Sequence, residues 1–211
     1  MKPARHAMVV AGTDTGVGKT VFAAALVRAL GADYWKPIQA GLEGPTDSEH
    51  VAELAAADGD RVVPERYRLT TPVSPHLAAE VEGIEIGVEA LQLPAGDNSL
   101  VVELAGGLMV PLTRSVLQVD LVASWRVPVV LVARTTLGTI NHALLSLEAM
   151  RARGIEVLGV AFVGDENGDS EITIAELGKV KRLGRLPFVD PLTGDALAAE
   201  FESNFVIEDF K

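Results

Sequence analysis

A glycine-rich segment near the start of the chain combines residue types that bind phosphate. It covers residues 11–20, AGTDTGVGKT. Glycines allow backbone N–H groups to approach phosphate oxygens and to form an anion nest. Lys19 can reach the terminal phosphates of a nucleotide, and the Thr20 hydroxyl can ligate Mg²⁺. Because Thr13 stands where the usual pattern has a glycine and Gly12 lies one position earlier, we predict a phosphate-binding loop that is longer than usual by one residue.

The elements on either side of this loop agree with that interpretation. Residues 7–10 form a short apolar run that is typical of a buried strand, and residues 21–30 are rich in helix formers and are followed by Gly31, a frequent C-cap. The N-terminus of the helix would add the positive end of its dipole. A glycine-rich turn without a ligand is the alternative, but strand, loop and helix in this order are the context that a phosphate-binding loop requires.

A lysine follows the second expected strand. The strand covers residues 33–36 and leads into a stiff loop over residues 37–41. In an open parallel sheet, ligands bind outside the carboxyl ends of the strands. Lys36 therefore falls near the phosphate loop if the two strands are neighbours. Its position alone equally allows a solvated lysine at the end of a strand.

Two acidic residues lie where a metal site could use them. A helix is expected to begin at Thr46 or Asp47, so Asp47 is either a helix cap or a metal ligand, and its position alone favours the cap. Glu103 follows the buried run of the strand over residues 99–107, as in a Walker B-type site, where a carboxylate faces the phosphate-loop threonine. The alternative for Glu103 is an exposed carboxylate.

The remaining sequence alternates between strands and helices, which predicts an α/β fold with a mostly parallel sheet flanked by helices. Further strands are expected at 129–133, 157–163 and 184–189, with extended segments at 62–63 and 67–69; helices are expected at 77–81, 116–125 and 143–153, briefly at 88–93, from Ser170 to about 182, and from Asp195 onward. Because no linker or internal repeat interrupts the pattern, we expect residues 1–211 to form a single domain of the P-loop NTPase kind.

The composition limits the classes of function. The net charge of −11 argues against sequence-independent binding to nucleic acid or to an anionic membrane surface. No apolar run approaches the roughly 20 residues that span a bilayer, and the N-terminus does not have the pattern of a signal peptide. The sequence contains no cysteine, which excludes disulfides and thiol nucleophiles. We therefore expect a cytoplasmic protein that binds neither nucleic acid nor membranes.

Taken together, these segments resemble the dethiobiotin synthetase family. The loop over residues 12–20 is nearly identical to that of the family, including the extra residue. Similar segments follow in the family's order: KPIQAG at 36–41, SPH at 74–76, ELAGG at 103–107 with PL at 111–112, LGTINHA at 137–143, and GRLP at 184–187. The first loop is shared with related ATPases, whereas the full series, which extends over nearly the whole chain, is far more specific.

The resemblance implies an ATP-dependent cyclo-ligase that converts 7,8-diaminononanoate, CO₂ and ATP to dethiobiotin, ADP and phosphate in biotin synthesis. One amine would take up CO₂ as a carbamate, the carbamate would attack the γ-phosphoryl group, and the second amine would close the ureido ring. No enzyme nucleophile is needed, so catalysis would rest on positioning and charge neutralisation. The family works as a homodimer on these small-molecule substrates.

The resemblance also assigns roles to residues. Lys19 and Lys36 would neutralise charge on the transferring groups, and Mg²⁺ would be held by Thr20, Asp47 and Glu103. The nucleotide would be bound by Gly16, Val17, Gly18, Lys19, Thr20, Val21, Asp47, Glu103, Gly106, Gly164, Pro187, Phe188 and Val189. The substrate would be bound by Thr15, Ala40, Gly41 and Asn141, with the segment 138–142 reaching the substrate carboxylate across the dimer interface, where a helix N-terminus suits an anion.

The chain departs from the family pattern in three places. Ala40 stands where a serine or threonine is frequent, which predicts a missing or replaced substrate hydrogen bond. Leu104 stands where a glycine is usual, which could reshape a turn near the phosphates. Val163 and Gly164 stand where many members have an asparagine that reads the adenine edge, so the base preference stays open.

Three other classes of protein share parts of this pattern. ATPase switches of the partitioning or metallochaperone kind often carry a second lysine early in the loop, where this chain has Thr13 and Asp14. Amidotransferase-type synthetases usually add a glutaminase domain, for which the chain has neither the length nor a cysteine. A plain nucleotide-binding module would leave Lys36, Asp47 and Glu103 without a role.

Overall fold

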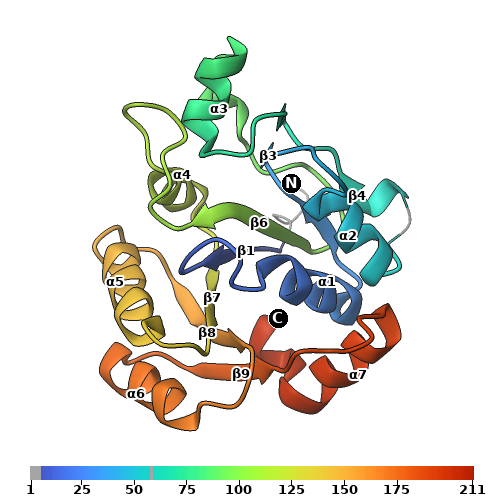
Figure 1. Ribbon diagram of the computed structural model, residues 1–211, viewed down its shortest axis with the longest axis vertical. Helices are drawn as coiled ribbons and strands as arrows, with labels where there is room; N and C mark the ends of the chain where they lie inside the picture. Colours follow the sequence, from blue (N-terminus) through green and yellow to red (C-terminus); the bar gives the residue numbers. More distant parts are fainter. Residues whose placement is uncertain (1–5, 58) are drawn as a thin grey trace.

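A parallel β-sheet forms the centre of the protein in a computed structural model, which describes residues 6–57 and 59–211 (Figure 1). Its seven strands lie in the order β4-β2-β6-β1-β7-β8-β9, and each neighbouring pair is parallel. The strands are β1 (Ala7–Gly12), β2 (Asp33–Trp35), β4 (Val62–Val63), β6 (Leu100–Gly107), β7 (Val129–Arg134), β8 (Val157–Val163) and β9 (Arg182–Leu186). A separate parallel pair joins β3 (Ile38–Ala40) to β5 (Tyr67–Leu69). The predicted α/β fold class is confirmed.

Helices cover both faces of the sheet (Figure 1). They are α1 (Lys19–Leu30), α2 (Asp47–Leu54), α3 (Pro75–Glu82), α4 (Gln118–Trp125), α5 (Thr139–Arg151), α6 (Gly168–Gly178) and α7 (Gly194–Asn204), with short 3₁₀ turns at η1 (Gly59–Arg61), η2 (Val88–Ala90) and η3 (Ile207–Phe210). α1, α2 and α7 pack together on one face, and α4, α5 and α6 lie on the other. No helix in the described residues has the length and apolar character to cross a bilayer.

The apolar residues of the strands explain this layering. In β1, Val9 belongs to the core that contains α4 and α5, whereas Met8 and Val10 belong to the core that contains α1 and α7. Successive side chains of a strand point to opposite faces, so a strand that is buried on both faces needs an unbroken apolar run. The second core is closed by stacked and tilted rings, with Phe201 and Phe205 stacked at 4.7 Å between their centroids.

The strand order corrects one premise of the sequence analysis. β2 is not a neighbour of β1, because β6 lies between them. Lys36 follows the carboxyl end of β2 and Glu103 lies in β6, so these two residues come from neighbouring strands. The side chain of Lys36 therefore lies beside Glu103, with 3.4 Å between Nζ and Oε1.

Two expected boundaries of α6 are wrong. Its N-cap is Asn167, whose side chain accepts a hydrogen bond from the backbone N–H of Ser170, so Ser170 is not the cap. The helix ends at Gly178, because Lys179 adopts a left-handed conformation with φ of 44°. Arg182 begins β9, where pairing with β8 overrides a helical continuation.

Gly184 offers a test of how tightly β9 packs on the C-terminal segment. Its φ is 155°, and a Cβ atom there would collide with the carbonyl oxygen of Asn204 and lie 2.7 Å from a ring carbon of Phe205. We expect Gly184→Ala to lower the free energy of unfolding by about 1–3 kcal/mol, measured by urea denaturation. The control is Gly168→Ala, where no atom lies within 4 Å; equal effects of the two substitutions would contradict the close packing.

Candidate functional site

The phosphate loop connects β1 to α1 and presents open backbone donors. Gly18 is the N-cap of α1 with φ of 91°, and no side chain caps the helix. The first N–H groups of α1 are therefore free of a side-chain acceptor and available to an anion. A Cβ atom at Gly18 would lie 2.6 Å from Cγ1 of Val163, so the loop needs glycine here both for its conformation and for its contact with β8.

Lys19 folds back over its own loop. Its Nζ donates to the carbonyl oxygen of Asp14 at 2.9 Å, and a Cβ atom at Gly12 would lie 2.8 Å from that Nζ. Burial lowers the pKa of Lys19 to about 8, although the negative charge of Glu103 opposes the shift. The side chain is thus held where the loop would surround a phosphate.

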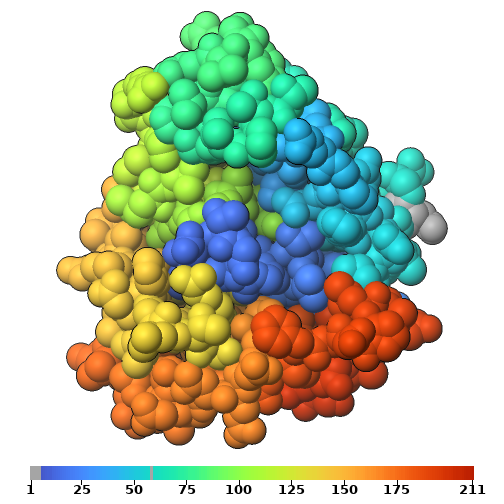
Figure 2. Space-filling model, in the orientation of Figure 1, coloured from blue at the N-terminus to red at the C-terminus, as the bar shows by residue number. Residues whose placement is uncertain are grey.

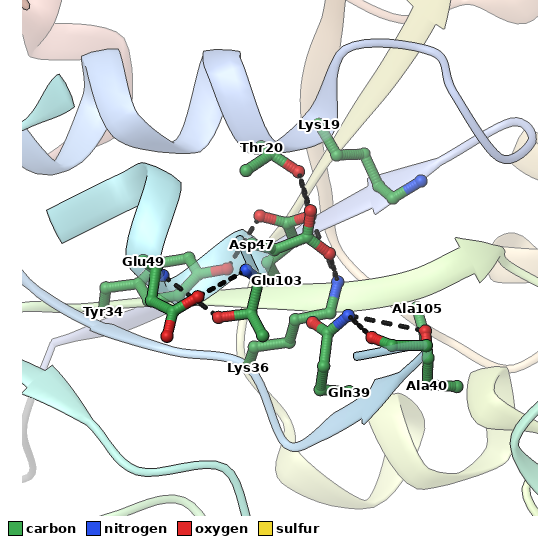
Figure 3. A network of polar contacts seen from close by, with 12 residues as sticks. Lys19, Thr20, Tyr34, Lys36, Gln39, Ala40, Asp47, Glu49, Glu103 and Ala105 are labelled. Atoms are coloured by element: carbon green, nitrogen blue, oxygen red, sulfur yellow. Dashed lines mark hydrogen bonds and ion pairs between the residues drawn. The ribbon is translucent and has the colours of Figure 1, made fainter. Parts of the chain in front are cut away.

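Thr20, Asp47 and Glu103 converge beside the loop (Figure 3). The Thr20 hydroxyl lies 2.9 Å from Oδ1 of Asp47 and 2.9 Å from Oε1 of Glu103. One hydroxyl carries one proton and can donate it to one carboxylate at a time. These three side chains therefore have more acceptor oxygens than protons to share. Oxygen atoms of this kind are the ligands that a hard divalent cation prefers.

The structure excludes one of the two interpretations of Asp47. Thr46 is the N-cap of α2, with a capping box in which its N–H donates to Oε2 of Glu49 at 2.6 Å and its hydroxyl accepts from the N–H of Glu49 at 3.3 Å. Asp47 is therefore not the cap. Its carboxylate is free to face Thr20 and Lys36 instead.

Lys36 lies between the two carboxylates. Its Nζ is 2.5 Å from Oδ2 of Asp47 and 3.4 Å from Oε1 of Glu103, and its side chain is 5% exposed. Burial would lower the pKa of Lys36, but the charges of Glu103 and Asp47 outweigh burial and raise it. Burial likewise opposes ionisation of Asp47, but the Lys36 charge holds its pKa below the usual value. Both groups are therefore charged at neutral pH.

Tyr34 completes this network and was missed in the sequence. Its side chain is fully buried, and its hydroxyl donates to Oε2 of Glu103 at 2.9 Å. Burial and the charge of Glu103 raise the pKa of Tyr34 well above its usual value. Tyr34 and Lys36 are two positions apart along an extended segment, so their side chains lie on the same face of the sheet. This spacing is the signal by which Tyr34 could have been identified in the sequence.

Two cavities meet at this network. One, of about 340 Å³, holds the phosphate loop, and the other, of about 440 Å³, lies beyond Lys36. Four residues line both cavities: Thr15, Lys36, Asp47 and Gly106. The second cavity is also lined by the expected Ala40 and by three residues that were not expected there, Gln39, Ser74 and Val110. Gly41 does not line it and instead packs its backbone near Pro72. A molecule in the second cavity can thus meet the end of a triphosphate.

A third cavity, of about 380 Å³, lies on the other side of the phosphate loop. It is lined by the expected Gly16, Val17, Gly18, Val21, Pro187, Phe188 and Val189, and also by Arg134, Thr135, Thr136, Val163 and Leu192. Among these residues, Phe188 is 72% exposed to solvent. Figure 2 shows the blue phosphate-loop segment at the surface, between the green, yellow and red parts of the chain.

Gly164, also expected to bind the nucleotide, does not line this third cavity, although a Cβ atom there would lie 3.7 Å from a ring carbon of Phe188. Its N–H donates to the carbonyl oxygen of Leu186, and its own carbonyl oxygen accepts from Arg185 at 3.0 Å. Asn167, the next asparagine along the chain, donates to the carbonyl oxygen of Thr135 and caps α6. It therefore does not take the place of the base-reading asparagine. Leu104 is buried inside β6, so it forms part of the core rather than a turn.

Asn141 stands apart from these cavities. It is exposed on the first turn of α5 and lines none of the three. His142 and Ser146 of the same helix line a neighbouring cavity of about 420 Å³ with Thr13 and Asp14. The structure of one chain therefore does not bring Asn141 to the other candidate residues.

The sequence is similar to known proteins over nearly its whole length. Residues 6–196 match the family described as AAA domain. An ATP-dependent dethiobiotin synthetase BioD from Nitrobacter hamburgensis is 61% identical over 203 residues, which are 96% of this chain and 96% of that protein. The protein of the same name from Brucella ovis is 60% identical, also over 96% of each chain.

Solved structures agree on the fold. A ParA family ATPase from Chlorobium tepidum has a TM-score of 0.53 at 12% identity, covering 98% of this chain and 96% of that one. The MinC:MinD cell division complex of Aquifex aeolicus has a TM-score of 0.52 at 13% identity, covering 92% of this chain and 86% of that one. At such low identity, the likeness shows a shared P-loop NTPase fold and no more.

Proposed function

The chain belongs to the ATP-dependent dethiobiotin synthetases of biotin biosynthesis, and from this premise we propose how its site closes the ureido ring of dethiobiotin. The observation that carries the proposal is the place of Lys36. Lys36 lines both the phosphate cavity and the cavity beyond it. A carbamate in one cavity and a γ-phosphoryl group in the other would meet at this cation.

ATP is proposed to occupy the phosphate loop and the third cavity. The triphosphate would accept hydrogen bonds from the open N–H groups of the loop and from Lys19. The base would lie against Phe188 and Val163, where contacts are mainly apolar and the polar groups of Gly164 are already paired. This arrangement supports binding of a base through shape and stacking more than through its hydrogen-bonding edge.

Mg²⁺ is proposed to be held by Thr20, Asp47 and Glu103. Oxygen donors of this kind, together with phosphate oxygens and water, are what Mg²⁺ prefers. The described residues contain no group of three or more acids, histidines or cysteines that could hold a metal, so the Thr20 hydroxyl is a necessary part of this set. Bound Mg²⁺ would offset charge on the phosphate oxygens during phosphoryl transfer.

The diamine is proposed to lie in the cavity beyond Lys36, near Thr15 and Ala40. One amine adds to CO₂ and loses a proton, giving a carbamate. A carbamate oxygen then attacks the γ-phosphorus, and the bond from that phosphorus to ADP breaks. The second amine attacks the carbamoyl carbon of this carbamic-phosphoric anhydride, and phosphate leaves. Lys36 and Lys19 would stabilise the negative charge that gathers on the transferring oxygens.

We also propose a homodimer in the cytoplasm. Leu137 is fully exposed, and Leu145 on α5 is 57% exposed, which supports a partner surface around the start of α5. Gly138 caps α5 in a left-handed conformation without a side-chain acceptor, so the first turn can receive the substrate carboxylate. Asn141 would contribute to the site of the second subunit. Use of ATP supports the cytoplasm as its location.

The proposed function is tested by phosphate release from Mg-ATP. We expect release to require both 7,8-diaminononanoate and bicarbonate, and mass spectrometry should detect dethiobiotin in equal amount. Omission of either substrate should return release to the background rate. Release that is indifferent to the diamine would contradict the proposal and favour an ATPase switch.

The lowered pKa of Lys19 predicts a pH dependence of ATP binding. Lys19 is an ammonium ion below its pKa of about 8 and neutral above it, whereas phosphate groups, with a second pKa of about 6, stay ionised. The affinity for ATP should therefore fall as pH rises through about 8, and binding at pH 8.5 should take up a proton. Isothermal titration calorimetry in two buffers of different ionisation enthalpy measures that uptake.

Lys19→Met provides the control for this pH dependence. It should bind ATP weakly at every pH and show no proton uptake above pH 8. Lys36 should not contribute to the proton uptake, because its pKa is raised and it stays charged over this range of pH. A wild-type affinity that is constant from pH 7 to 9.5 would contradict the prediction.

A further inference from the structure

The carboxylate of Glu103 has different partners on its two oxygens. Oε1 faces Thr20 at 2.9 Å and Lys36 at 3.4 Å. Oε2 points the other way and accepts from the Tyr34 hydroxyl at 2.9 Å (Figure 3). The two sets of contacts fix the plane of the carboxylate, with one oxygen directed at the phosphate cavity and the other directed into the core.

The hydrogen bond from Tyr34 to Glu103 is shielded from water. Glu103 is 1% exposed and Tyr34 is 0% exposed, so water cannot readily replace the phenol as a donor. A buried carboxylate oxygen that loses its donor carries a desolvation cost and is free to turn toward other donors. Lys36, whose Nζ already lies 3.4 Å from Oε1, is one such donor, and a turn of the carboxylate toward it would change the direction of Oε1.

We propose that Tyr34 is a positioning residue of the cation site, whose hydroxyl holds Oε2 of Glu103 so that Oε1 stays directed at the metal bound with ATP. This inference rests on the proposed role of Glu103 as a Mg²⁺ ligand. Partners of a metal-binding carboxylate orient it and tune its affinity, and their loss typically weakens metal binding about 10- to 100-fold. Tyr34 itself lines neither the phosphate cavity nor the cavity beyond Lys36.

The test is the affinity for Mg²⁺ in the presence of a non-hydrolysable ATP analogue, measured by calorimetry without diamine. Tyr34→Phe removes one hydroxyl and keeps the ring, so we expect Mg²⁺ to bind about 10-fold more weakly. Binding of the analogue in EDTA should be unchanged. Mg²⁺ affinity equal to that of the wild type would overturn the inference.

Tyr67→Phe is the matched control, because Tyr67 is the other of the two tyrosines in the chain. Its hydroxyl accepts from the N–H of Gly87 at 2.9 Å and is not part of the site. This variant should bind Mg²⁺ as the wild type does. Glu103→Gln tests the proposed metal site separately from the role of Tyr34. If it leaves Mg²⁺ affinity intact, the proposed metal site fails together with the inference; if it weakens binding while Tyr34→Phe does not, the inference alone fails.

Turnover gives a second readout that a purely structural role would not change. The kcat of Tyr34→Phe should recover as Mg²⁺ is raised, with an unchanged KM for the diamine. A loss of folded protein would lower the rate equally at every Mg²⁺ concentration, and failure to recover would overturn the inference.

A spectroscopic measurement covers the case in which Tyr34→Phe does not fold. In the Tyr67→Phe variant, 3-fluorotyrosine labels position 34 alone, and the protein should give one ¹⁹F resonance. Addition of Mg²⁺ to the complex with the ATP analogue should shift this resonance, because charge on Glu103 is then shared with the cation. A resonance that does not move would overturn the inference.

Discussion

Lys36→Met should lower kcat about 100- to 1,000-fold, the usual effect of removing one group that stabilises charge in a transition state. Lys36 is the cation that both cavities share, and its raised pKa keeps it charged across the working range of pH. Its ammonium is proposed to stabilise the oxygens of the carbamate and of the transferring phosphoryl group. Single-turnover phosphate release at saturating substrates measures the loss of chemistry apart from binding.

The same substitution should not weaken binding of Mg²⁺ and ATP. The Lys36 ammonium contacts the carboxylates of Asp47 and Glu103, so it competes with a cation for them. Lys179→Met changes an exposed lysine at the end of α6 and should leave kcat unchanged. A normal kcat in Lys36→Met, or equal losses in both variants, would contradict the role of Lys36.

Much of the site could be predicted because its parts are local in the sequence. The phosphate loop is contiguous, and its glycines are required by backbone geometry that Gly18 shows directly, with positive φ and a close contact to Val163. Glu103 was identified because an acid follows a buried run before a glycine turn. Each inference depends on residues within a few positions of one another, where local physics is sufficient.

Other features depend on contacts between distant segments. The placement of β6 between β1 and β2 follows from packing of the whole sheet, and no single strand reveals it. Asp47 looked like a cap because an acid at a helix start often is one, whereas the capping box of Thr46 and Glu49 had already supplied that function. Tyr34 was expected only as part of the strand over residues 33–36, because its contact with Glu103 depends on β6 being the neighbouring strand.

The end of α6 shows the same limit for secondary structure. Residues 179–182 carry no glycine or proline, and the stop signal of Gly178 was not used when the helix was extended to about 182. The structure ends it with Lys179 in a left-handed conformation and then pairs Arg182 with β8. Tertiary pairing of β9 therefore decides the boundary, as it often does where local propensity is weak.

The second large effect is expected at Thr20, where the isosteric change Thr20→Val removes only the hydroxyl. That hydroxyl lies 2.9 Å from an oxygen of Asp47 and 2.9 Å from an oxygen of Glu103. Without it, the proposed cation site loses one oxygen donor, and two carboxylates lose their shared proton donor. A hydrogen bond to a charged group contributes about 1.5–3 kcal/mol, so the Mg²⁺-dependent part of ATP affinity should fall about 10- to 100-fold.

Thr20→Ser is the matched control, because it keeps the hydroxyl and removes only a methyl group. It should retain most of the Mg²⁺-dependent affinity, whereas Thr20→Val should bind ATP almost equally with Mg²⁺ and with EDTA. Calorimetric titrations of the two variants under both conditions measure this difference directly. If Thr20→Val kept the full enhancement by Mg²⁺, the hydroxyl would not be a ligand, and Asp47 and Glu103 would have to hold the cation without it.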